Sequence, residues 1–94
     1  MATPEELLES VVDQTTFIEF VEALADERDR ALEIEQANPK AYIVDGALGW
    51  KNGDIAAFLG AGLQYFMETP LRKPEREPSW KMFAEFLYFG KIYE

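Results

Sequence analysis

The side chains with the greatest chemical potential in this chain are carboxylates, because the sequence contains neither histidine nor cysteine. Four of them fall close together and, at helical spacing, would bring two or three carboxylates to one face: Asp26, Glu27, Asp29 and Glu33. Helical bundles build metal and acid–base sites in this way, usually with a histidine beside each glutamate. Here Arg28 and Arg30 are interleaved instead, which favours a solvated charged face. We therefore expect no catalytic residue, no metal ligand and no cofactor, and we predict that the protein is not an enzyme.

Other reaction classes lack their required groups. Without histidine, a hydroxyl has no base for a Ser/His/Asp mechanism, and without cysteine there are no disulfides, thiol nucleophiles or cysteine-bound zinc. The glycine-containing stretch 46–53 is not followed by the Gly-Lys-Ser/Thr of a phosphate-binding loop. A ligand pocket that combines carboxylates with Tyr42, Trp50 or Tyr65 remains the open alternative.

Charge is distributed very unevenly along the chain. Residues 1–38 hold eleven acidic and two basic residues, whereas residues 39–94 hold seven of each, so the whole net charge of −9 lies in the first part. Such a field repels nucleic-acid phosphates and steers a basic protein partner toward this half. The acids expected on the outer face of a helix here are candidate partner-binding residues: Glu19, Glu22, Asp26, Asp29 and Glu33.

The C-terminal stretch is rich in aromatic residues. Six of the thirteen aromatic residues follow Ser79. We assign Trp80, Phe83 and Leu87 to the core, but the segment is apolar on more than one side. The surplus side chains Phe86, Phe89 and Tyr93 are therefore candidates for an interface, since aromatic residues dominate binding hot spots. Either a homodimer or a groove for another protein would use them.

The elements that must position these residues are predicted to be helices near 4–12, 14–37, 54–68 and 79–90, in a single all-α domain over residues 1–94. Thr3-Pro4-Glu5-Glu6 is a capping box, and Asp13 or Thr16 can cap the second helix. The helix 54–68 has the clearest apolar periodicity, and its small residues Ala57, Gly60 and Ala61 favour a central position. Gly90 is a natural residue to end the last helix.

Two connecting segments complete this prediction. Residues 38–53 contain several turn signals around Trp50, which we expect to pin the segment to the core. Thr69–Pro78 contains three prolines and a basic middle, which indicates an exposed, stiff loop able to lie against the acidic helix. The alternative fold is α+β, with a minor strand pair from Tyr42–Val44 and Lys91–Tyr93.

The cellular location follows from what the sequence lacks. No apolar run approaches the roughly 18 residues needed to span a membrane. Residues 1–12 carry three glutamates and no basic side chain, unlike a secretory signal. We therefore expect a cytoplasmic protein with no membrane partner.

Three segments resemble a family of small bacterial proteins of unknown function. The resemblance rests on Asp13 to Phe20, on the Trp50-Lys51-Asn52 segment before the Phe58-Leu59 helix, and on the block from Ser79-Trp80 to Tyr93-Glu94. It spans most of residues 13–94. The family has no established activity to transfer, and some of its members look like neighbours of toxin–immunity systems.

The function expected from these features is non-catalytic protein binding. One form is an immunity-like or antitoxin-like inhibitor, whose acidic helix covers a basic active site on its partner. The alternative is a homodimeric structural or accessory subunit that associates through the aromatic C-terminal helix.

Overall fold

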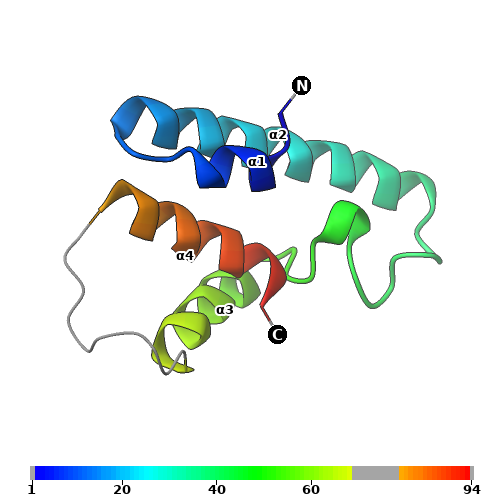
Figure 1. The fold of residues 1–94 in the computed structure, drawn as a ribbon. Helices are drawn as coiled ribbons and strands as arrows, with labels where there is room; N and C mark the ends of the chain where they lie inside the picture. Colours follow the sequence, from blue (N-terminus) through cyan, green and yellow to red (C-terminus); the bar gives the residue numbers. More distant parts are fainter. Residues whose placement is uncertain (1, 69–78, 94) are drawn as a thin grey trace.

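The computed structural model describes residues 2–68 and 79–93, and these form an all-α domain, as the sequence predicted. The α-helices are α1 (Pro4–Glu9), α2 (Gln14–Ala37), α3 (Ile55–Glu68) and α4 (Trp80–Ile92), with a 3₁₀ turn, η1 (Ala47–Gly49), between α2 and α3. Figure 1 shows α1 antiparallel to α2, α4 running beside α2 in the same direction, and α3 crossing α4 on the side away from α2.

Short polar side chains fix where each helix begins. Thr3 accepts a hydrogen bond from the Glu6 backbone N–H while Glu6 reaches back to Thr3, so the predicted capping box is present. Asp13 caps α2 by accepting from the N–H of Thr16. Asp54 and Ser79 play the same role for α3 and α4. Each cap satisfies a backbone donor that has no partner within its own helix.

The helix ends differ from the sequence prediction in two places. The first helix ends at Glu9 rather than near residue 12, and Val11 turns into the core instead. The last helix continues through Gly90 to Ile92. Residues 42–44 form turns and bends, and no strand occurs anywhere in the described ranges, so the α+β alternative is wrong.

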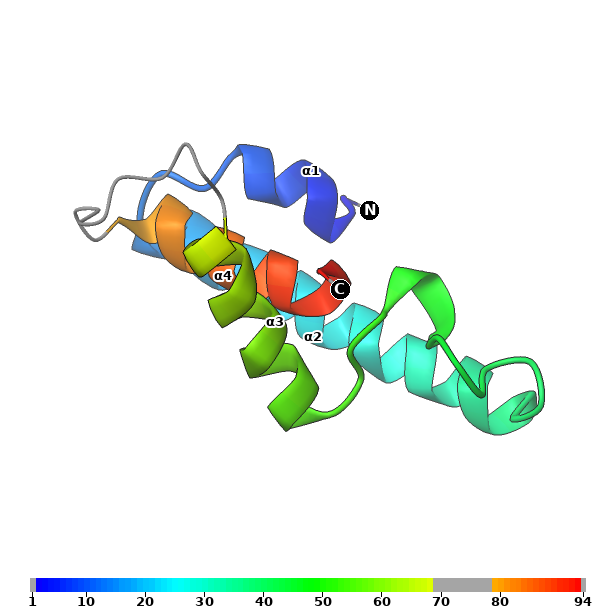
Figure 2. The same ribbon diagram turned by 90° about the horizontal axis from the view of Figure 1, so that it is seen from below.

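The central helix is α4, and the prediction that the helix 54–68 lies in the middle is wrong. α4 packs against α1, α2 and α3, whereas α3 packs mainly against α4. Figure 1 shows α4 between α2 and α3, and Figure 2, turned by 90°, shows it between α1 and α3. Apolar periodicity identified α3 as a helix, but periodicity does not say which neighbour covers its apolar face.

The α3–α4 crossing depends on two glycines that allow close approach. A Cβ at Gly62 would lie 3.0 Å from the Phe86 carbonyl oxygen, and one at Gly90 would lie 2.9 Å from the Phe58 carbonyl oxygen. Gly90 is therefore a packing residue inside α4, not the residue that ends it. Gly60, expected to permit helix contact, instead faces open space, since a Cβ there would meet nothing within 4 Å.

The main core lies between α2, α4 and the connector 38–53. Its buried residues are Val11, Phe20, Leu24, Ala31, Ala47, Trp50 and Ala84. Trp50 is only 4% exposed and stacks on Phe58, which confirms that it pins the connector to the core. The connector is also held by Glu35, which accepts from the Ala47 N–H at 2.8 Å. The predicted proline-rich loop, including Arg72–Arg76, falls outside the described residues.

Candidate functional site: an acidic groove between α1 and α2

A groove of about 660 Å³ lies between the N-terminal segment and the middle of α2. Its apolar lining comes from both sides: Ala2, Pro4, Leu7 and Ala23. Its polar lining comes entirely from α2: Glu19, Glu22, Asp26, Asp29 and Arg30. The volume is in the range of natural ligand-binding sites, and the mixture of apolar and charged lining residues suits a peptide rather than a purely apolar molecule.

Four of the five acids predicted to bind a partner line this groove. Glu19, Glu22, Asp26 and Asp29 share one face of α2 because they are spaced by three or four residues. Glu33 is exposed and continues the same stripe beyond the groove. In the described part of the chain, none of the five carboxylates makes an ion pair or a side-chain hydrogen bond. Their charge therefore remains available, opposed within the lining only by Arg30.

The α1 side of the groove is held in place by two lysines of α4. The Lys81 ammonium donates to the carbonyl oxygen of Leu8, near the end of α1. Lys91 forms an ion pair with Glu5, with 3.2 Å between Nζ and Oε1. These contacts join α1 to the central helix. The position of α1 at the groove therefore does not depend on the six residues of α1 alone.

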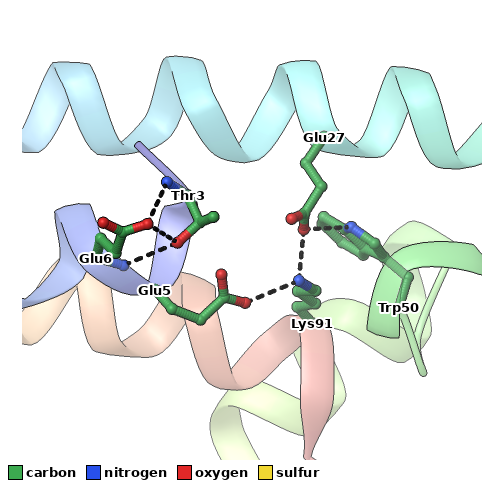
Figure 3. Close-up of polar contacts among 6 residues, drawn as sticks. All are labelled: Thr3, Glu5, Glu6, Glu27, Trp50 and Lys91. Atoms are coloured by element: carbon green, nitrogen blue, oxygen red, sulfur yellow. Dashed lines mark hydrogen bonds and ion pairs between the residues drawn. The ribbon is translucent and has the colours of Figure 1, made fainter. Parts of the chain in front are cut away.

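Glu27 does not belong to the groove, although it lies next to Asp26 in sequence. Its side chain points into the core, where Lys91 pairs with it and the Trp50 indole N–H donates to it at 3.0 Å (Figure 3). Lys91 and Glu27 side chains are only 2% and 10% exposed. The carboxylates considered as a metal-binding group therefore diverge, and in the ranges described no three such side chains gather to hold a metal ion.

Burial and the contact between Glu5 and Lys91 shift the pKa values of two nearby side chains. Burial raises the pKa of the Tyr88 hydroxyl, and the negative charge of Glu5 adds to this effect. Partial burial acts to raise the pKa of Glu5, but hydrogen bonds from its own backbone and from Lys91 outweigh this, so its pKa is lowered. Glu5 therefore stays charged at neutral pH and keeps its contact with Lys91.

The aromatic candidates Phe86, Phe89 and Tyr93 are half-buried against α3. Phe89 stacks on Tyr65 with ring centroids 3.7 Å apart, and Phe86 meets Phe66 edge-on. Tyr93 donates its hydroxyl hydrogen to Glu68 at 3.0 Å, which is the largest cause of its raised pKa. Much of the aromatic surplus noted in the sequence is thus used to join α3 to α4.

Sequence reasoning missed the buried Glu27–Lys91 pair. A signal was present, because Glu27 follows Phe20 by seven residues and Leu24 by three, which places it on the apolar face of α2. A carboxylate at such a position requires a buried partner. Nothing in the local sequence identified Lys91, 64 residues away, as that partner.

Two of the segments that carry the family resemblance contact each other. Lys51 N–H donates to the Lys91 carbonyl oxygen at 3.0 Å, and the Asn52 amide donates to the carbonyl oxygens of Gly90 and Tyr93. Together with the Trp50–Glu27–Lys91 contacts, these bonds fasten the connector to the end of α4. These residues therefore have structural roles that account for their types and spacing.

Comparisons with known proteins leave the function to be argued from the structure. No family model, no curated protein and no solved structure matches the chain. Among the helices that the structure describes, none has the length and apolar character to cross a membrane.

Proposed function

We propose that this protein is a non-catalytic protein-binding module, and that the groove between α1 and α2 receives a basic segment of a partner protein. The observation that supports this is a groove lining that combines apolar side chains with unpaired carboxylates. Burying apolar side chains supplies affinity, while opposite charges supply orientation and a fast association rate. An exposed acidic helix without apolar side chains beside it would offer only the second contribution.

The partner segment that fits best is an amphipathic one. The wall from Glu19 to Arg30 spans about 16 Å along α2, which corresponds to roughly three helical turns. A helix of that length with Lys or Arg on one side and an apolar anchor on the other would match both surfaces. Since basic active sites are common in enzymes that act on nucleic acids, an immunity-like or antitoxin-like inhibitor is a concrete form of this function.

The alternative function is a homodimeric structural or accessory subunit that associates through the aromatic C-terminal helix. It predicts a dimer that Phe89→Ala or Tyr93→Ala weakens. Both side chains already pack against α3, so less of their surface is free for a partner. The groove is therefore the better-supported site. The cytoplasmic location and the bacterial resemblance inferred from the sequence stay predictions.

The proposal is tested by affinity capture at low salt with two charge-matched variants. Asp26→Lys reverses one groove carboxylate, whereas Glu9→Lys makes the same change in net charge at an exposed residue outside the groove lining. We expect a stoichiometric basic partner that wild type and the second variant retain at low salt, and that the first variant loses. Equal loss in both variants, or a complex insensitive to salt, would contradict a groove-directed interaction.

A further inference from the structure

The outward face of α3 carries a row of exposed apolar side chains. Ile55, Leu59, Leu63 and Met67 are 78%, 46%, 55% and 82% exposed. They are spaced by four residues and therefore form a single ridge along the helix. No charged residue occurs between Ile55 and Met67, in a chain whose net charge is −9. An apolar row of this length on a small acidic protein calls for a partner surface.

A row of small residues, called here the low row, runs beside this ridge. Ala56 and Gly60 lie one residue further along at each step, and both are exposed. A Cβ at Gly60 would meet nothing within 4 Å, so no contact within the described chain accounts for glycine there. Glycine in a helix interior costs roughly 1 kcal/mol relative to alanine. The ridge and the low row beside it therefore supply the ridge and the groove of a ridge-into-groove contact.

We propose that this face of α3 is the interface of a symmetric homodimer. A two-fold interface requires a self-complementary surface, and the row meets that requirement because its spacing is symmetric about residue 61. Antiparallel packing of two copies places Ile55 against Met67 and Leu59 against Leu63. Leu63 and Met67 of each copy then lie beside Gly60 and Ala56 of the other.

The available area and the charge distribution both favour a second copy as the occupant. The four exposed side chains present on the order of 500 Å² per copy, so two copies bury about 1,000 Å², the lower bound for a specific interface. Helix α2, with its acidic face, lies on the far side of α4 from α3 (Figures 1 and 2). Dimerisation through α3 therefore keeps the two acidic faces apart and leaves both grooves open.

The test is the oligomeric state of the full chain by sedimentation equilibrium, from low micromolar to near-millimolar concentration. We expect a concentration-dependent dimer whose dissociation constant rises at least about tenfold in Leu59→Glu/Leu63→Glu, because each glutamate would be buried without a partner. The matched control is Ile43→Glu/Val44→Glu, at exposed apolar positions in the connector, and it should leave the dimer unchanged. A wild-type monomer throughout, or equal dimerisation of both variants, would overturn the proposal.

A second variant guards against simple misfolding of the first. Gly60→Leu fills the low row but meets no atom of the monomer near its Cβ, so circular dichroism should show a native helix content while the dimer weakens.

Salt provides a further distinction from groove binding. Screening reduces the repulsion between two copies that each carry a charge of −9, so the dimer should persist or strengthen as salt rises, whereas capture of a basic partner weakens. A dimer that dissociates with rising salt would count against the α3 interface.

Discussion

At the scale of single residues, the fold is organised around one buried charge pair. Lys91 joins α4 to Glu27 of α2 and to Glu5 of α1, while the Trp50 indole shares the Glu27 carboxylate. Four segments of the chain therefore meet at two nearly buried side chains. Such a pair contributes little net stability compared with apolar residues, but removing one partner alone is costly, because the other charge stays buried.

We predict that Lys91→Met destabilises the protein by about 3–5 kcal/mol, since it leaves the Glu27 carboxylate without its ammonium partner. In Glu27→Gln/Lys91→Met the loss should be clearly smaller, because the introduced amide oxygen still accepts from Trp50 and no buried charge remains. Urea unfolding of the wild type, both single variants and the double variant measures this coupling. Additive effects of the two substitutions would show that the pair is not coupled.

A second residue-scale prediction concerns acid stability. The side-chain hydrogen bonds from Arg28 hold the pKa of Glu35 below its usual 4.5, and the Ala47 N–H adds to this effect. The pKa of Glu5 is lowered as well. Because both folded-state pKa values are lowered, the stabilisation is complete above pH 4.5 and is lost as the pH falls through the lower folded values.

Unfolding measured between about pH 7 and pH 2.5 should therefore show stability that is nearly constant near neutrality and falls below about pH 4.5. Glu35→Gln should lower stability at neutral pH and reduce the slope in the acid range, because the titrating group is gone. Glu33→Gln, at an exposed position on the same helix, is the matched control, because it leaves the contact between Arg28 and Glu35 in place. An identical acid slope in all three proteins would refute the role of Glu35.

At the scale of the elements, the helix starts were predictable and the packing order was not. Thr3 and Asp13 marked two helix starts because capping depends on side chains within a few residues. The central position of α4 depends on contacts between segments far apart in sequence. Gly60 and Gly62 look equivalent in the sequence, yet Gly62 lies at the α3–α4 crossing and Gly60 faces open space.

The glycines give a paired prediction at this scale. Gly60→Ala should raise stability by up to about 1 kcal/mol, since alanine is the better helix former and its Cβ meets nothing. Gly90→Ala gains the same propensity but places its Cβ 2.9 Å from the Phe58 carbonyl oxygen, so it should destabilise by about 1–3 kcal/mol. Thermal unfolding of the two variants and the wild type in dilute solution measures these changes in stability. A stabilising Gly90→Ala would mean that the α3–α4 crossing is looser than described.

At the scale of the whole molecule, the two surfaces proposed to bind partners differ in character and occupy opposite sides of α4. The groove face is acidic and lies between α1 and α2, whereas the outer face of α3 is apolar and uncharged. The sequence indicated the acidic face correctly, because Glu19, Glu22, Asp26 and Asp29 share helical spacing that needs no tertiary information. It could not reveal the apolar part of the lining, since Pro4 and Leu7 reach α2 only through the packing of α1 on the rest of the fold.

The most direct test of the central claim is to map the partner contact on isotopically labelled protein by amide NMR, with the captured partner titrated in at low salt. We predict that chemical-shift changes concentrate at residues 2–7 and 19–30, spare the exposed row Ile55, Leu59, Leu63 and Met67, and diminish as salt is added. Changes that centre on α3 or on the C-terminal aromatic residues, with the groove amides unaffected, would contradict the assignment of the acidic groove as the binding site.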